Sequence, residues 1–139
     1  MYNKYVETDK ALTTHIHHHD HLLVEKFRAL IRKNILEGGT DNRNRAVKYF
    51  ASHLSVHPNH LNAVVKRETQ KTAIAFIHEQ LSHKAKSLLS QTGLSIKEIA
   101  FKLGFTEPSH FYHFFKKQMN TTPVLYRKEK QLSFSHNSI

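Results

Sequence analysis

The sequence predicts an all-α protein in which one helical unit occurs twice. Only four of the 139 residues are glycine and three are proline, and the chain has few of the alternating β-branched runs that indicate strands. Apolar residues instead recur at helical spacing along most of the chain. A faint repeat, at an interval of 49 to 50 residues, groups these helices into two similar units. The length suffices for one compact domain or two very small ones.

The first forty residues contain one expected helix. Residues 1–21 are polar, show no clear period and are interpreted as a His-rich tail or linker. Residues 22–36 have apolar side chains at helical spacing, and Gly38-Gly39-Thr40 ends this helix. Its apolar face comprises Leu23, Phe27, Leu30, Ile31 and Ile35.

Three further helices are expected in the middle of the chain. The first covers residues 43–53, and the second begins at Pro58, because proline is tolerated in a first turn. The third is long, about residues 72–90, and Gln91-Thr92-Gly93 ends it. The inward positions are Val47, Phe50, Ala51 and Leu54 in the first helix, Leu61, Val64 and Val65 in the second, and Ile74, Ile77, Leu81, Ala85, Leu88 and Leu89 in the third.

Residues 94–128 predict a helix, a tight turn, a second helix and a further short helix. Ser95 and Glu98 have the spacing of a capping box, and Gly104 stands where a helix ends in a left-handed residue. Thr106 is expected to cap the next helix, with Pro108 in its first turn. The apolar face of that helix is Phe111, Phe114 and Phe115. A short helix with a buried stripe and a basic outer face, held by a partner helix across a glycine turn, indicates a helix-turn-helix.

The same unit occurs earlier in the chain. Ala51, Leu54 and Val56 recur 49 positions later as Ala100, Leu103 and Phe105, and Leu61, Val65, Lys66 and Thr72 recur 50 positions later as Phe111, Phe115, Lys116 and Thr122. The one-residue difference falls in the turn, where an insertion is tolerated. A connecting helix of about 18 residues spans roughly 27 Å. Two recognition helices held this way are expected to enter successive major grooves, about 34 Å apart.

The positive charge coincides with these units. The formal net charge is +10, and residues 41–130 contain 15 of the 21 basic side chains but only 6 of the 11 acidic ones. A surface of this kind displaces counterions from phosphates, so duplex DNA is the expected partner.

Several other classes of protein are excluded by absences in the sequence. There is no cysteine, no apolar run near the ~20 residues of a membrane span and no signal-peptide pattern, so a cytoplasmic protein without a membrane partner is expected. No Ser/His/Asp constellation, phosphate-binding glycine loop or ordered carboxylate pair appears. We therefore expect no enzyme and no cofactor.

At these residues the chain resembles the AraC/XylS family of bacterial transcription regulators, specifically their C-terminal DNA-binding domain. The second unit, SIKEIAFKLGF followed by SHFYHFFKK and TTPVLYRK, is the family's most specific signature, and VKYFASHLSVHPNHLNAVVKRETQKTA is a looser match. The resemblance implies about seven helices in two helix-turn-helix subdomains joined by a linker helix. It also implies a bipartite DNA site and, often, contacts to RNA polymerase.

The resemblance sets the expected domain organisation. We expect a DNA-binding domain over residues 22–131 and a disordered tail over 132–139. Within the domain, the first helix-turn-helix covers about 43–70, the linker helix 72–90, the second helix-turn-helix 95–119 and the final helix 122–130. Many members have an N-terminal sensor or dimerisation domain, which we expect to be missing from this chain. The chain is then either an excised domain or a small stand-alone member.

The chain departs from the family after each recognition helix. The family usually has glycine there, whereas this chain has Gln70 and Asn120. Asparagine adopts positive φ readily, and glutamine does so at a cost of about 1 kcal/mol. Ala73 also stands where proline is common, while Pro123 is present in the second unit. These differences affect local geometry and leave the expected fold unchanged.

The outer, N-terminal part of each recognition helix is expected to read bases. The candidates are Asn59, His60, Asn62 and Ala63 in the first unit and Pro108, Ser109, His110 and His113 in the second. Asparagine can pair with adenine, and alanine can meet a thymine methyl group. The candidates for phosphate contact are Arg43, Arg45, Lys66, Arg67, Lys71, Tyr112, Lys116 and Lys117. For each lysine the alternative is a solvated surface charge, and for Tyr112 it is cover for the core edge.

The remaining aromatic and apolar side chains of the two units are assigned to packing. They are Phe50, Leu61, Val65, Phe105, Phe111, Phe115 and Tyr126. A binder of RNA or single-stranded DNA would instead expose aromatic side chains on strands.

A histidine cluster supports an alternative function. His15, His17, His18, His19 and His21 lie close together with Asp20, and imidazoles at this density can bind zinc, nickel or copper. The cluster lies outside the expected fold and has no visible second shell to orient ligands. Metal binding is therefore retained as the alternative to DNA binding, with no metal site assigned.

Overall fold

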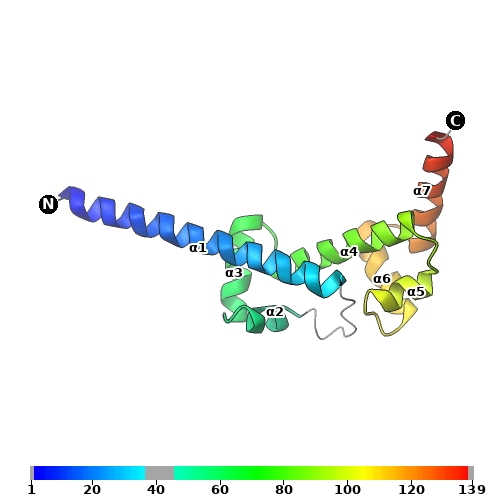
Figure 1. The fold of residues 1–139 in the computed structure, drawn as a ribbon, viewed down its shortest axis with the longest axis horizontal. Helices are drawn as coiled ribbons and strands as arrows, with labels where there is room; N and C mark the ends of the chain where they lie inside the picture. The colour runs from blue at the N-terminus through cyan, green and yellow to red at the C-terminus, as the bar shows by residue number, and fades with distance from the viewer. Residues whose placement is uncertain (1, 37–45, 138–139) are drawn as a thin grey trace.

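The computed structural model describes the backbone of residues 2–36 and 46–137, and the side chains of residues 18–35 and 46–133. Within these ranges the chain forms helices and no strands, as expected for an all-α protein (Figure 1). The helices are α1 (Tyr2–Leu36), α2 (Val47–His53), α3 (Pro58–Thr69), α4 (Ala73–Gln91), α5 (Ile96–Lys102), α6 (Pro108–Met119) and α7 (Pro123–Asn137). None of the described helices is long and apolar enough to cross a membrane.

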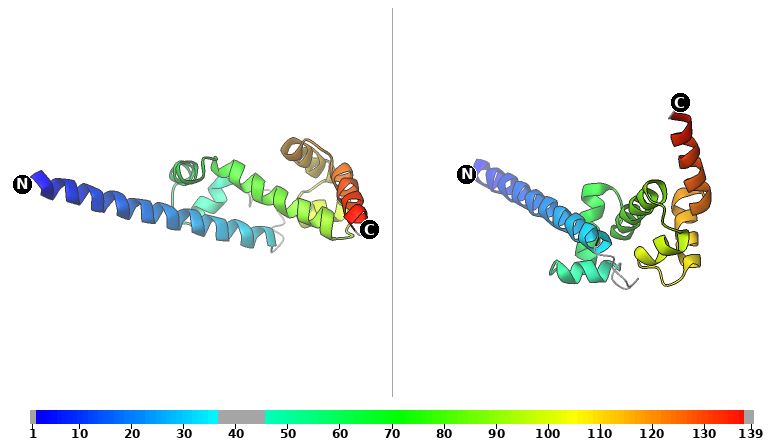
Figure 2. Two further views of the ribbon diagram at one scale, coloured as in Figure 1. Left: turned by 90° about the horizontal axis from the view of Figure 1, so that it is seen from above. Right: turned by 45° about the vertical axis from the view of Figure 1, so that its right-hand side comes forward.

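The long helix α4 connects two lobes. In the first lobe α1, α2 and α3 pack on one another, and α1 and α3 also pack on α4; in the second lobe α5, α6 and α7 pack on α4 (Figures 1 and 2). Arg127 of α7 fastens the second lobe to the end of α4, because its Nε donates to the Leu89 carbonyl at 3.0 Å and its guanidinium also reaches the Thr92 carbonyl at 3.3 Å. The expected pair of helix-turn-helix subdomains on a linker helix is therefore present.

Helix α1 begins much earlier than expected. The helix expected over residues 22–36 begins at Tyr2 instead, so the expected tail or linker is part of α1, and the N-terminal half of α1 extends beyond the rest of the molecule (Figure 1). Asp20, within the expected tail, is only 6% exposed and lies against α3.

Four smaller expectations also need correction. Helix α2 begins at Val47 instead of residue 43, and α7 continues to Asn137 through the residues expected to be a disordered tail. Thr106 does not cap α6, because Glu107 occupies the N-cap position. Ile74, expected to face inward, is 41% exposed, and Phe76, two residues later, is buried instead.

The two units match closely in backbone geometry. Helices α2 and α5 have seven residues each, and α3 and α6 have twelve. The turns correspond too, because Ser55 has φ of 58° where the second unit has Gly104 with φ of 86°. The amide of the next residue closes each turn, from Val56 to Ala51 at 3.0 Å and from Phe105 to Ala100 at 2.9 Å. Here Ser55 accepts a conformation that glycine adopts without a Cβ penalty.

Both recognition helices end in the left-handed region, although neither ends in glycine. Gln70 has φ of 66° and Asn120 has φ of 57°. The Gln70 side chain donates to the Arg67 carbonyl at 3.2 Å, which satisfies one free carbonyl at the helix end. Thr72 and Thr122 then cap α4 and α7 by accepting from the amides of Ala75 and Leu125.

Aromatic side chains make up much of the core. In the first lobe Phe27 packs edge-to-face on Phe50, with ring centroids 5.6 Å apart, and also contacts Phe76. In the second lobe Phe111 lies between Phe105 and Phe115. The expected packing residues Phe50, Leu61, Val65, Phe105, Phe111 and Phe115 are buried, and Tyr126 is half-buried against Phe115.

Candidate nucleic-acid interface

The N-terminal turns of α3 and α6 present the expected base-reading side chains to solvent. Asn59, His60 and Ala63 are exposed on α3, and Ser109, His110 and His113 are exposed on α6. Pro58 and Pro108 occupy the first turn of each helix. Figure 2 shows α3 beside the beginning of α4 and α6 further along it. Six of the eight expected positions are thus exposed, and Pro108 lies half-buried at the rim.

Asn62 has a different environment. Its side chain is half-buried, and its Oδ1 accepts a hydrogen bond from the backbone N–H of Ala73 at 2.9 Å. Bidentate pairing with adenine needs both the oxygen and the nitrogen of an asparagine amide. Because the oxygen already binds the first residue of α4, the geometry favours Asn62 as a link between α3 and the linker helix.

The second recognition helix has a continuous group of polar and aromatic side chains on its outer face. The Thr106 hydroxyl lies 3.4 Å from Nδ1 of His110, and the rings of Tyr112 and His113 are 5.4 Å apart in an edge-to-face contact. Lys116 places its Nζ 5.9 Å from the centre of the Tyr112 ring. Imidazole nitrogens can donate or accept, so His110 and His113 are suited to either kind of base edge.

The basic side chains of the two units differ in their partners. Arg67 is paired with the buried carboxylate of Asp20, and Lys71 is paired with Glu79. The hydrogen bond from Lys71 is the main cause that lowers the pKa of Glu79 below its ordinary value. Lys66, Lys116 and Lys117 are exposed and form no ion pair with any residue whose side chain is described. Arg43 and Arg45 lie outside the described residues.

Three basic residues that were not among the expected phosphate contacts lie on the first helices of the two units. Lys48 is exposed on α2, and Lys97 and Lys102 are exposed on α5. In a helix-turn-helix the first helix crosses the DNA backbone, so these side chains join the candidates for phosphate contact. The same argument, applied to the helix before each turn, finds them in the sequence.

A half-buried histidine lies beneath the second recognition helix. His78 of α4 packs edge-to-face on Phe114 of α6, with ring centroids 5.4 Å apart. Burial, together with the positive charge of Lys117, lowers the pKa of His78 below its ordinary value. Both effects favour the neutral form of the imidazole at the α4–α6 contact.

The histidine cluster of α1 is not assembled into a described metal site. His18, His19 and His21 are exposed, whereas Asp20 points into the α1–α3 contact. The side chains of His15 and His17 lie outside the described set. Among the described side chains, no three histidine, cysteine or carboxylate groups are placed to hold a metal ion.

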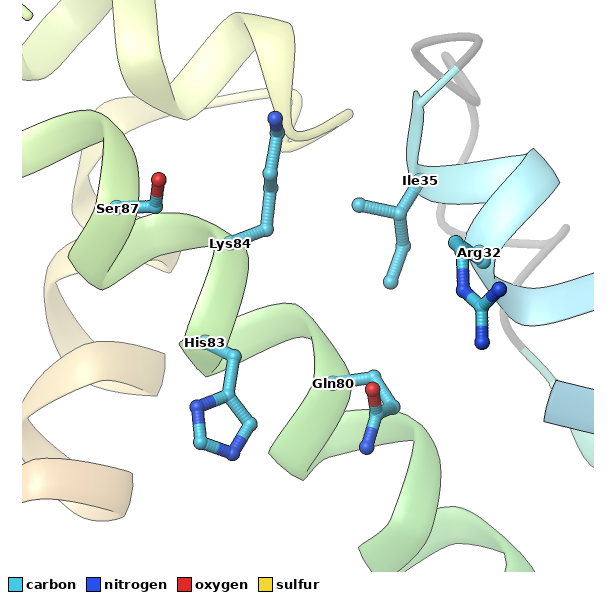
Figure 3. A pocket seen from close by; sticks show the side chains of 6 residues that line it. All are labelled: Arg32, Ile35, Gln80, His83, Lys84 and Ser87. Carbon is cyan, nitrogen blue, oxygen red and sulfur yellow. The ribbon is translucent and has the colours of Figure 1, made fainter. Parts of the chain in front are cut away.

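A shallow groove separates α1 from α4. Figure 3 shows Arg32 and Ile35 of α1 facing four side chains of α4, which are Gln80, His83, Lys84 and Ser87. Its volume of about 240 Å³ is smaller than the about 300–1,000 Å³ of typical small-molecule pockets. We assign it no ligand.

Residues 50–129 match a protein-family model described as a helix-turn-helix domain, which spans both units. The chain belongs to the AraC/XylS family. The xylose operon regulatory protein of Haemophilus influenzae is 40% identical over 75 residues, or 54% of this chain and 19% of that protein. The melibiose operon regulatory protein of Escherichia coli is 33% identical over 81 residues, or 58% of this chain and 27% of that protein.

Solved structures support the same AraC/XylS assignment. The C-terminal domain of the response regulator yesN from Fusobacterium nucleatum is 29% identical, with a TM-score of 0.61 over 72% of this chain and 96% of that one. The C-terminal domain of AraT from Geobacillus stearothermophilus is 27% identical, with a TM-score of 0.64 over 75% and 84%. The DNA-binding domain of AdpA, solved in complex with a target DNA, shares the fold at 17% identity and a TM-score of 0.65, over 77% of this chain and 94% of that domain.

The family determines the class of function. The chain contains a DNA-binding domain of the AraC transcription-regulator type. It spans about a fifth of the length of the xylose regulator that it matches.

Proposed function

We propose that this chain recognises one bipartite site on duplex DNA, with α3 and α6 in successive major grooves. The observation that carries the proposal is the pair of matched twelve-residue helices held by the single helix α4. Its 19 residues correspond to about 28 Å of helix, close to the about 34 Å of one DNA turn. A helix of this kind sets the distance between the two readers without a flexible joint.

Base recognition is assigned to the exposed N-terminal side chains. Asn59, His60 and Ala63 read the first half-site, and Ser109, His110 and His113 read the second, with Pro108 at the rim. Asn62 is left out of this set because its carbonyl oxygen binds Ala73. The phosphate contacts are assigned to Lys66, Lys116, Lys117, Tyr112, Lys48, Lys97 and Lys102.

The two units contribute unequally to the proposed affinity. Two of the expected phosphate-binding cations of the first unit, Arg67 and Lys71, are paired with carboxylates. Lys116 and Lys117 of the second unit are exposed without such a partner among the described side chains. A cation neutralised within the protein releases fewer counterions from DNA. The second unit should therefore anchor the complex, and the first should add sequence discrimination.

Selection from random duplexes tests the proposal. The chain should enrich one asymmetric site of about 20 base pairs, with two conserved blocks one helical turn apart. Its affinity for that site should exceed a weaker, strongly salt-dependent background. Recovery of no enriched sequence by the folded protein would contradict the proposal.

A regulatory role at promoters in the cytoplasm follows from this activity. The relatives named above are regulators of xylose and melibiose operons, and the bound domain would act on nearby transcription. RNA polymerase is the proposed second partner, as the family resemblance implies. Transcription in vitro from a promoter with the selected site should change when the protein is added. An unchanged transcript level with the site occupied would separate DNA binding from regulation.

A further inference from the structure

Glu107 introduces a negative charge at the end of α6 that faces solvent beside the proposed base readers. Helix α6 itself contains no acidic residue and has Lys116 and Lys117 in its last turn. Glu107 is the N-cap residue and is exposed. A carboxylate at this place is repelled by DNA phosphates, so it weakens binding unless it meets a hydrogen-bond donor on the DNA.

Glu107 does not act as a capping side chain. An N-cap side chain normally accepts from the amide two or three residues later, and no such bond is present in α6. The corresponding residue of the first unit, His57, does cap its helix, since its Nδ1 accepts from the amide of Asn59 at 3.1 Å. The carboxylate of Glu107 instead accepts a long hydrogen bond, 3.5 Å, from the hydroxyl of Ser109. That bond orients the carboxylate alongside the proposed reading positions.

The electronic character of a carboxylate limits which bases it can meet. It accepts hydrogen bonds and donates none. The donors in the major groove are the amino groups of cytosine and adenine, whereas the major-groove edges of guanine and the O4 of thymine are acceptors. The adenine amino group lies between two acceptors, its own N7 and the O4 of the paired thymine. The cytosine amino group has a C–H on one side, so a carboxylate meets less repulsion there.

We propose that Glu107 reads a cytosine in the second half-site by accepting from its N4 amino group. The inference rests on the proposed function, since it requires the N-terminal end of α6 to enter the major groove. Discrimination then has two parts. The hydrogen bond favours cytosine, and repulsion by guanine and thymine acceptors disfavours the alternatives. The first half-site has no equivalent contact, because His57 is used as a cap.

Three variants test separately the charge of residue 107, the length of its side chain and the position of the carboxylate in the fold. Glu107→Gln keeps the size but removes the charge and adds a donor, and Glu107→Asp keeps the charge but shortens the side chain. Glu98→Gln is the matched control, because Glu98 is exposed on α5 and only its backbone amide, which binds Ser95, is used for capping. Thermal melting of each variant checks that all three remain folded.

The measurement is a selection from random duplexes, followed by titrations of the selected site and its three substitutions at one base pair. The wild type should prefer cytosine at one position of the second half-site by about tenfold or more. Glu107→Gln should shift the preference from cytosine toward adenine, because a glutamine amide both accepts and donates and pairs with adenine N6 and N7, and it should bind non-specific DNA more tightly. Glu107→Asp should lose the preference without that gain, and Glu98→Gln should keep it.

The outcomes distinguish this inference from the proposed function. An enriched wild-type site whose cytosine preference persists in Glu107→Gln would overturn the role of Glu107 and leave the bipartite site intact. An enriched site with no cytosine in the second block would overturn it as well. If the wild type enriches nothing, the proposed function itself fails, and the inference fails with it.

Discussion

Asn62 shows how one hydrogen bond can change the role of a residue within a recognition helix. Its position in the first unit, near the N-terminal end of α3, is one that reads bases in a helix-turn-helix. In the folded chain its oxygen accepts from the amide of Ala73, a fully buried residue at the beginning of α4. Without that acceptor the amide would be buried with no partner, because Ala73 begins the helix.

Asn62→Ala should therefore lower the free energy of unfolding by about 1–3 kcal/mol, since it leaves a buried donor unsatisfied. Urea denaturation measures the change. Asn59→Ala provides the control, because Asn59 is exposed and its own side chain makes none of the described bonds. Equal stability of the two variants would show that the Asn62–Ala73 bond contributes little.

Lys116 and Arg67 should affect the salt dependence of DNA binding differently. Lys116→Ala should weaken binding to all sequences alike and reduce the salt slope by about 0.9. Arg67→Ala should leave the slope nearly unchanged, because Arg67 is paired with Asp20. It should instead lower stability by about 1–2 kcal/mol, since the buried carboxylate loses its partner although Arg67 itself is half exposed. A matching fall of the slope in both variants would place Arg67 on a phosphate.

At the level of single helices, the ends of α3 and α6 show how far the residue type predicts a left-handed helix end. The family geometry after each recognition helix is retained, with Gln70 and Asn120 in the conformation that glycine usually adopts. The sequence predicted this conformation for Asn120 more securely than for Gln70. The backbone around the helix end, and not the residue alone, determines the conformation, because Thr72 must begin α4 two residues later.

Gln70→Gly should raise the free energy of unfolding by about 0.5–1 kcal/mol, because it removes the strain of a left-handed glutamine. The gain is reduced by the loss of the hydrogen bond from Gln70 to Arg67. Gly104→Ala should have the opposite effect and cost about 1 kcal/mol or more, since Gly104 has φ of 86°. Chemical denaturation of both variants tests the pair, and stabilisation by Gly104→Ala would contradict the assignment.

The contact between α4 and α6 should make stability depend on pH. Burial and Lys117 lower the pKa of His78 in the folded protein below the ordinary histidine value of 6.5. The unfolded chain then binds a proton more readily, so this contribution is complete above pH 6.5 and is lost as the pH falls through the folded pKa. His78→Gln should flatten the fall in melting temperature between pH 7 and pH 5. An unchanged pH profile would show that other groups cause it.

Much of the element pattern could be predicted from the sequence, and the errors share a physical cause. The repeat, the capping box at Ser95 and the turn at Gly104 depend on neighbouring residues, so local patterns revealed them. Asp20 and Phe76 depend on contacts with distant parts of the chain. No local pattern distinguishes a buried acid that meets Arg67 from a solvated one. The same limit applies to Asn62, whose partner lies eleven residues away in the next helix.

For the whole molecule, α4 sets the spacing of the proposed readers. Insertion of about five base pairs between the two half-sites turns one of them to the opposite face of the duplex. The affinity should then fall to that of the second half-site alone, because α4 is a continuous helix and α3 cannot follow. Fluorescence anisotropy with matched duplexes measures this loss. Retention of full affinity would indicate that the lobes move independently.

Helix α1 is coupled more closely to one recognition helix than to the other. Its only described ion pair to a recognition helix joins Asp20 to Arg67 of α3, and its C-terminal turns pack on α2 and α4. The main contacts of α1 are with α2, α3 and α4, and those of α6 are with α4, α5 and α7, so a displacement of α1 would reach α3 directly and α6 mainly through α4. Such a displacement would act on the contacts of α3 with the first half-site before those of α6 with the second. The first half-site is the one that we propose to be bound more weakly.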